Sequence, residues 1–128
     1  MLKIIDLNIS LSAQGEYVVL QNQGLITVSL RGWALCTDAY LAGSVEKMTD
    51  EMYIFTQDEP IKPYTRVVLF TGEGSPGWYG TVDGKQAYLE YWCRPSPVWS
   101  KAGQLNLLHV ASSRKIAAWN ESPELALA

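Results

Sequence analysis

Residues 16–35, EYVVLQNQGLITVSLRGWAL, hold the pattern that decides the fold. Glu16 to Leu20 is rich in aromatic and β-branched residues, and Gln21 to Gly24 has the composition of a turn. Leu25 to Leu30 then alternates apolar and polar residues, and a short break precedes a further strand-like run that begins at Trp33. Short strands that recur at intervals of about ten residues are typical of all-β sandwiches and barrels.

The same pattern continues on both sides of this stretch. Upstream, Ile4 to Leu11 alternates so that Ile5, Leu7, Ile9 and Leu11 share one face of a predicted strand. Downstream we expect strands at Met52–Thr56, Thr65–Thr71, Ala87–Trp92, Gln104–Val110 and Lys115–Trp119, and turns at Pro60–Pro63 and Ala111–Arg114. Trp78–Thr81 is expected to be a strand or a turn. Thr65 to Thr71 is apolar nearly throughout, which predicts a central strand.

Helical signals are almost absent. Residues 38–51 are interpreted as an insertion or loop with at most one turn of helix, around Ser44 to Met48. The sequence therefore predicts one all-β domain of about eight or nine strands over residues 1–120. Residues 121–128 contain a proline and few anchors, and we expect a flexible C-terminal tail there.

Composition narrows the class of protein. The 128 residues are 48% hydrophobic and 18% charged, as expected of a domain with a real core. The net charge of −3 gives no global attraction to nucleic acid or acidic membranes. The N-terminus lacks the apolar region of a secretory signal, and no run is long enough to span a membrane, so we expect a cytoplasmic protein. Cys36 and Cys93 are then expected to be a buried pair of free thiols, with a disulfide between them as the alternative.

Few catalytic or metal-binding arrangements are possible. His109 is the only histidine and two cysteines cannot complete a zinc site, which excludes most zinc and Ser–His–Asp chemistry. Cys36 is better explained as a small buried residue than as a nucleophile with His109 as its base. The Gly72–Gly77 run matches GxGxxG, but no helix follows it, and the acids of residues 46–59 lack the spacing of a calcium loop. We therefore expect no enzyme activity, no metal and no cofactor.

Four segments together resemble a known family. They are Glu16–Asn22, Val28–Leu35 with its Gly-Trp pair, the Pro63 turn followed by Val67–Phe70, and Val98–Gln104 leading to Leu108. In these segments the chain resembles the lamin tail domain, which occurs in nuclear lamins and in many bacterial proteins. The resemblance implies an immunoglobulin-like β-sandwich that serves as an interaction or tethering unit. The residues that carry the motif are Tyr17, Asn22, Gly32, Trp33, Trp99 and Gly103.

Two of these motif residues have direct physical roles in the predicted fold. A tryptophan that follows a glycine, as Trp33 follows Gly32, can turn inward and fill the space between two sheets. Asn22 can bond nearby backbone and fix the loop that follows it.

The candidate binding residues lie in the C-terminal half, where aromatic and basic residues alternate. They are Trp78, Tyr79, Lys85, Tyr88, Arg94, Lys101, Arg114 and Lys115. Aromatic rings near loops stack on bases or sugars, and the local positive charge attracts anions. We expect a binding module for protein or nucleic acid, with self-association through a sheet edge as a further possibility. The alternatives are that these rings are core residues, or that Trp78, Tyr79 and Tyr88 bind a carbohydrate or a surface.

Overall fold

The computed structural model describes residues 1–38, 45–101 and 104–109. These residues form ten strands, one short α-helix and a 3-10 turn. In chain order they are β1 (Leu2–Asn8), β2 (Tyr17–Asn22), β3 (Val28–Ser29), β4 (Trp33–Thr37), α1 (Val45–Asp50), β5 (Met52–Ile54), β6 (Pro60–Ile61), β7 (Arg66–Phe70), β8 (Gly77–Gly80), β9 (Gln86–Tyr91), η2 (Trp99–Lys101) and β10 (Leu105–His109). The prediction of an all-β chain with little helix is confirmed for these residues.

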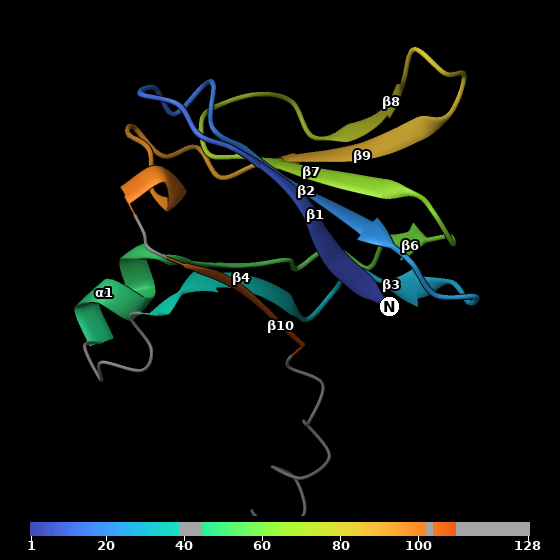
Figure 1. Cartoon of the computed structure of the whole chain (residues 1–128), viewed down its shortest axis with the longest axis horizontal. Coiled ribbons are helices and arrows are strands. Elements are labelled where there is room, and N and C mark those ends of the chain that lie inside the picture. The colour runs from blue at the N-terminus through green and yellow to red at the C-terminus, as the bar shows by residue number, and fades with distance from the viewer. Residues whose placement is uncertain (39–44, 102–103, 110–128) are drawn as a thin grey trace, which may run out of the picture.

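The largest sheet has five strands in the order β1-β2-β7-β9-β8 (Figure 1). Its neighbours pair antiparallel except for β7 and β9, which run parallel. The predicted central position of the strand after Pro63 is confirmed, because β7 lies in the middle of the order. Val67 and Leu69 of this strand are fully buried on the face that looks into the molecule.

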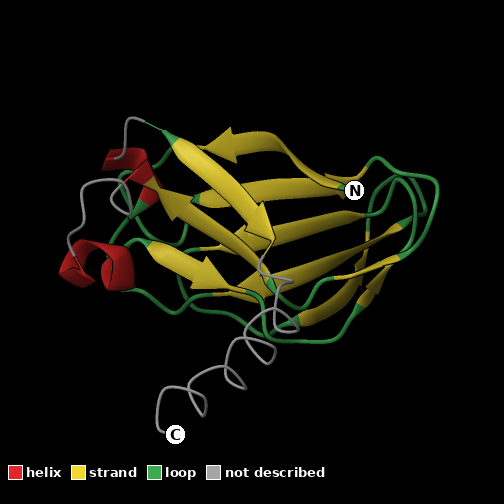
Figure 2. Ribbon diagram, turned by 90° about the horizontal axis from the view of Figure 1, so that it is seen from below, coloured by secondary structure: helices red, strands yellow, loops and turns green. Residues whose placement is uncertain are grey.

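The second layer is a three-stranded sheet in the order β10-β4-β5, and β3 and β6 form a separate two-stranded ribbon. Figures 1 and 2 show the five-stranded sheet lying across the three-stranded sheet, with α1 at one end. The core fills the space between the two layers. Its fully buried large residues include Val18, Leu20, Leu35, Phe55, Val67, Leu69 and Trp99.

The first strand departs from the predicted alternation. Ile4 pairs with Leu20 but Asp6 pairs with Val19, so Ile5 is an extra residue in a β-bulge. The bulge reverses the facing of the residues that follow it, so Ile4 and Leu7 pack on the core while Ile5 is exposed. The prediction that Ile5, Leu7, Ile9 and Leu11 share one face is therefore wrong; the strand also ends at Asn8.

The predicted strand Leu25–Leu30 is much shorter than expected. Only Val28 and Ser29 pair, with Ile61 and Pro60, so Pro60–Ile61 is a strand and not simply part of a turn. Leu25 and Ile26 are 87% and 73% exposed. The Nδ2 group of Asn22 donates to the carbonyl of Ile26, which takes this carbonyl out of strand pairing and holds the segment in a turn.

The prediction that Asn22 bonds nearby backbone and fixes the loop after it is confirmed. This fully buried side chain also donates to the carbonyl of Ile61, and its Oδ1 accepts from the Gly24 N–H and from the N-terminal amine. It therefore joins the end of β2 to the loop over Gly24–Ile26, to β6 and to the N-terminus.

The Gly32–Trp33 pair also behaves largely as predicted. Gly32 has φ 90°, a conformation that favours glycine. Trp33 packs against the core from a half-buried position and stacks on His109 with ring centroids 4.3 Å apart. His109 is thus an exposed strand residue in contact with an aromatic ring.

Glu16 is a fully buried carboxylate that fastens the 3-10 turn η2 to the sheet. Its Oε1 accepts from the Thr71 hydroxyl at 2.5 Å and from the N–H groups of Val98 and Trp99 at 2.9 and 3.1 Å. Its Oε2 accepts from the N–H and hydroxyl groups of Ser100. Burial alone raises the pKa of this carboxyl, but the hydrogen bonds from Ser100, Thr71, Val98 and Trp99 together lower it below its ordinary value.

The remaining expectations concern the two cysteines, the insertion before β5 and the C-terminal segments. Both cysteines are free, but only Cys36 is buried and Cys93 is exposed after β9, so they are not a buried pair. The helix α1 covers Val45–Asp50 of the predicted insertion 38–51. Residues 39–44, Gly103, the predicted hairpin and strand over residues 111–119, and the tail 121–128 lie outside the described residues.

Candidate functional site

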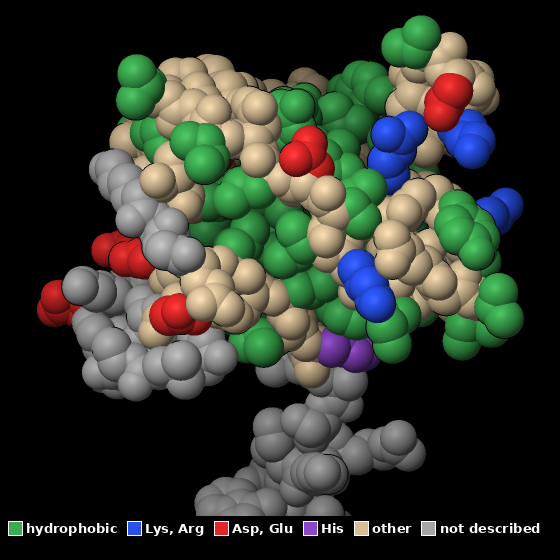
Figure 3. Space-filling model, in the orientation of Figure 1, with side chains coloured by type: hydrophobic (Ala, Val, Ile, Leu, Met, Phe, Trp, Pro, Cys, Tyr) green, Lys and Arg blue, Asp and Glu red, His purple; other side chains and the backbone are tan. Residues whose placement is uncertain are grey.

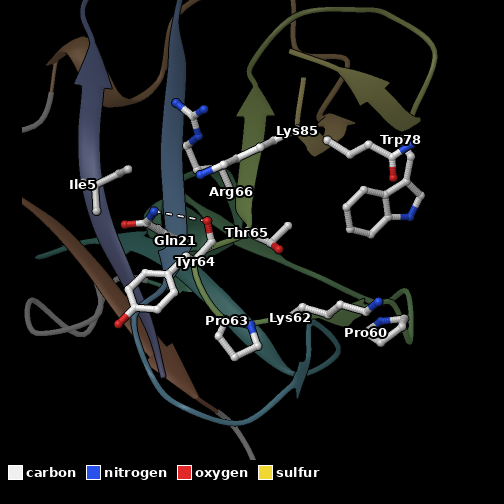
Figure 4. A pocket seen from close by; sticks show the side chains of 11 residues that line it. Ile5, Gln21, Pro60, Lys62, Pro63, Tyr64, Thr65, Arg66, Trp78 and Lys85 are labelled. Atoms are coloured by element: carbon white, nitrogen blue, oxygen red, sulfur yellow. Dashed lines mark hydrogen bonds between the residues drawn. The ribbon is translucent and has the colours of Figure 1, made fainter. Parts of the chain in front are cut away.

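A groove of about 580 Å³ lies near one end of β2 and β7, where residues of the five-stranded sheet and of the segment that begins at β6 line it together (Figure 4). Its walls come from four places in the sequence: the bulge of β1, the end of β2, the segment from β6 to the start of β7, and the β8–β9 hairpin. The lining residues are Ile5, Gln21, Pro60, Lys62, Pro63, Tyr64, Thr65, Arg66, Trp78, Lys85 and Gln86. The bulge in β1 explains how the apolar side chain of Ile5 comes to face this groove.

Tyr64 is the most unusual residue of the groove. Its φ of 63° lies in the left-handed region, which is costly for a residue with a bulky side chain. The conformation is held by two hydrogen bonds: the Tyr64 N–H donates to the Asn22 carbonyl at 2.5 Å, and the Gln21 Nε2 donates to the Tyr64 carbonyl at 3.2 Å. The turn thereby presents a tyrosine ring that is 59% exposed.

Three cations line the groove: Lys62, Arg66 and Lys85. Arg66 forms an ion pair with Asp83 at 3.4 Å, and both side chains are more than a third exposed, so water screens this pair strongly. On the face drawn in Figure 3, the visible Lys and Arg side chains lie on the right-hand half, and most Asp and Glu side chains lie on the left, toward α1. The charge of the groove is therefore positive although the chain as a whole is negative.

Trp78 separates this groove from a second pocket. It is 38% exposed and lines both hollows, and its Nε1 donates to Glu59 Oε1 at 3.0 Å. The second pocket, of about 480 Å³, is lined by Tyr53, Thr56, Gln57, Glu59, Pro76, Gly77, Trp78, Tyr88, Glu90 and Tyr91. The two hollows thus share one indole wall but differ in the sign of their charge.

The structure brings only part of the predicted binding set together. Trp78 and Lys85 line the groove, whereas Tyr88 is buried and lines the second pocket. Tyr79 lines neither of these hollows, and its hydroxyl donates to the Ser75 carbonyl. Arg94 lies elsewhere: its guanidinium is 5.0 Å from the Trp92 ring centroid and donates to the Asp50 carbonyl.

The other predicted cations cannot be assigned to the groove. Arg114 and Lys115 lie outside the described residues, as does the side chain of Lys101. The sequence prediction also missed the charged and aromatic groove residues Lys62, Tyr64 and Arg66, because a turn at Pro60–Pro63 and a central strand at Thr65–Thr71 do not in themselves indicate ligand binding. The alternation of cation, proline and aromatic residue just before a central strand was the available signal.

Other kinds of site are not supported by the described residues. In the ranges 1–38, 45–101 and 104–109, no cluster of three His, Cys, Asp or Glu side chains could hold a metal ion. None of the helices in those ranges has the length and apolar character needed to cross a membrane. The chain matches no protein-family model, no curated protein and no solved structure.

Proposed function

We propose that the chain is a binding module whose groove holds a short segment of single-stranded nucleic acid. The observation that carries this proposal is the combination of three cations with two exposed aromatic rings in one groove, namely Lys62, Arg66 and Lys85 with Tyr64 and Trp78. Proteins that bind single strands combine these same two elements, a basic groove for the phosphates and rings on which bases stack.

The cations supply the affinity for phosphate. Lys62 and Lys85 are exposed, and Arg66 is engaged by a screened pair with Asp83. A phosphate group competes well for such an arginine because the pairing is bidentate and the existing partner is solvated. The net charge of −3 argues against long-range steering, so binding depends on contacts made inside the groove.

The aromatic rings supply the preference for single strands. Bases that are not paired are free to stack on exposed rings, and each such contact is worth roughly 1–3 kcal/mol. The left-handed conformation of Tyr64 fixes the direction in which its side chain leaves the backbone before any ligand arrives. Residues held in such costly conformations cluster at binding sites, which adds weight to this assignment.

The finer fold assignment is part of the same proposal. The two layers of strands, the buried Trp99 and the Gly32–Trp33 bend agree with an immunoglobulin-like sandwich of lamin-tail type. A tethering role follows from that resemblance and is compatible with nucleic-acid binding. The carbohydrate-binding alternative has less support, because Trp78 and Tyr88 are inclined at 55° and Tyr88 is buried, so they do not form a flat exposed platform.

The test is a titration of the protein into a fluorescein-labelled oligothymidylate, followed by fluorescence anisotropy at low salt. We expect saturable binding that the double variant Lys62→Glu/Lys85→Glu reduces at least about tenfold. The control is Arg31→Glu, which changes charge by the same amount per residue at an exposed position that does not line the groove.

Two results would reject the proposal. In one, the Lys62→Glu/Lys85→Glu variant and the Arg31→Glu variant bind the oligothymidylate with equal affinity. The other is binding of an oligoglutamate peptide but not of the oligonucleotide, which would assign the groove to an acidic protein segment.

A further inference from the structure

We propose that the second pocket, on the other side of Trp78, binds an alkylammonium group. This site goes beyond the nucleic-acid groove, with which it shares the lining residue Trp78. Four aromatic residues line the pocket: Tyr53, Trp78 and Tyr88, whose polar side-chain atoms bond to Glu59 or Glu90, and Tyr91, whose ring stacks on Phe70. Rings that surround a hollow attract cations through their negative faces, and aromatic cages are the usual way in which proteins recognise alkylated ammonium groups.

The charges around the pocket have the sign that such a ligand needs. Two carboxylates, Glu59 and Glu90, line it, and no Lys or Arg side chain is among its lining residues. Gln57 and Thr56 add neutral polar groups at exposed positions. The pocket is therefore anionic and aromatic, whereas the neighbouring groove is cationic. The two hollows that share Trp78 thus suit ligands of opposite charge.

Glu90 is the deepest of these groups. It is only 5% exposed, and its two oxygens accept hydrogen bonds from Tyr53 and from Tyr88. Burial, and then the hydrogen bond and charge of Glu90, raise the pKa of Tyr53 far above its ordinary value. Burial, and then the charge and hydrogen bond of Glu90, raise the pKa of Tyr88 to about 12. Both hydroxyls therefore stay protonated donors, and their hydrogen bonds hold the two tyrosines against the Glu90 carboxylate.

The second carboxylate is bonded to the tryptophan that lines the pocket. Glu59 is half-buried and accepts from Trp78 Nε1 at 3.0 Å, so it orients the indole that forms the shared wall. A cation placed between the Trp78 ring and the two carboxylates gains from all three groups. The pocket volume of about 480 Å³ lies within the range of small-molecule sites.

The experiment uses choline and 3,3-dimethylbutan-1-ol, which have the same shape but differ in charge. Binding is followed in ¹H–¹⁵N spectra through the indole N–H signal of Trp78, assigned with a Trp78→Phe variant. We expect choline to give a saturable shift and the neutral alcohol to bind at least about fivefold more weakly. Glu59→Gln should weaken choline at least about threefold, and Glu46→Gln, an exposed acid on α1, should not change it.

Three outcomes would overturn the proposal: no saturable shift with choline, equal binding of the neutral alcohol, or a shift with methyl glucoside in the absence of one with choline. Because Glu90→Gln could disturb folding, Glu59→Gln is the deciding variant, and its unfolding midpoint is checked beside that of Glu46→Gln. The Lys62→Glu/Lys85→Glu variant should still bind choline even where it no longer binds the oligonucleotide, because neither lysine lines the pocket.

Discussion

Replacement of Glu16 by glutamine is the most informative perturbation of the fold. The wild-type carboxylate accepts five hydrogen bonds, three at Oε1 and two at Oε2. A glutamine has one acceptor oxygen, so its NH₂ group must face one of the two sets of donors. If the oxygen keeps the Thr71, Val98 and Trp99 donors, the NH₂ group faces the Ser100 N–H, which then has no acceptor.

The expected cost follows from these contacts. One backbone N–H left without a partner costs about 1–3 kcal/mol, and the remaining bonds lose the strengthening that a charged acceptor gives. We expect Glu16→Gln to lower the free energy of unfolding by about 2–4 kcal/mol. Urea denaturation followed by tryptophan fluorescence measures this, because Trp99 beside the site is buried.

A matched control separates this effect from a general effect of charge. Glu73→Gln changes an exposed acid on a loop and should alter stability by no more than about 0.5 kcal/mol. If Glu16→Gln also lowers the free energy of unfolding by less than about 0.5 kcal/mol, the reasoning is refuted. Such a result would mean that the buried hydrogen bonds of Glu16 do not stabilise the native state.

The pH dependence of the free energy of unfolding tests the role of the Glu16 carboxylate in a second way. The folded-state pKa of Glu16 is lowered, so its stabilisation is complete above the ordinary glutamate pKa of about 4.3 and is lost as the pH falls through the lower folded value. Wild-type stability should therefore fall more steeply than that of Glu16→Gln as the pH is lowered below about 4.3. Parallel curves for the two proteins over this range would contradict the assignment.

Three further predictions concern residues that fix turns and loops of the domain. Asn22→Ala should lower the free energy of unfolding by about 2–4 kcal/mol in urea denaturation, because four hydrogen bonds of a buried side chain are lost; a smaller loss than in an exposed Gln23→Ala control would contradict this. Tyr64→Gly should raise the free energy of unfolding by about 1 kcal/mol, because glycine adopts the left-handed conformation without strain, and it should weaken oligonucleotide binding because the ring is lost. A Tyr64→Gly variant that is less stable than the wild type would contradict the idea that Tyr64 is strained. Gly32→Ala should cost about 1 kcal/mol or more, measured by calorimetry, because φ 90° strains any residue with a Cβ; no change in Tm would be inconsistent with that geometry.

The regular strands were predictable from local pattern. Val67 and Leu69 lie in an apolar run that marks a strand covered on its inner face, and this run is β7. Asn22 was predictable because an asparagine just before a glycine turn bonds backbone within a few residues. These inferences succeed because the interactions involved are short in sequence.

The irregular features could not be predicted from the same pattern. The alternation around Ile5 indicates a strand but contains nothing that marks a bulge, which depends on pairing with β2. Leu25 and Ile26 alternate correctly, yet the Asn22 side chain takes the Ile26 carbonyl and the strand does not extend there. In both cases a tertiary contact overrides the local preference.

The groove illustrates the same limit at the level of function. Trp78 and Lys85 were identified because aromatic and basic residues are close together in that part of the sequence. Lys62, Tyr64 and Arg66 reach them only because β7 and β8 both lie beside β9 in the sheet. Arg94 was included for the same local reason, but its contact with the Trp92 ring places it elsewhere.

The most direct test of the central claim is the salt dependence of oligothymidylate binding. With three cations lining the groove, and a slope of about −0.7 per phosphate contacted on a single strand, the plot of log K against log salt should have a slope of about −2. Lys62→Ala should reduce the magnitude of that slope by about 0.7. A slope near zero, or one that Lys62→Ala leaves unchanged, would contradict a phosphate-binding role for the groove.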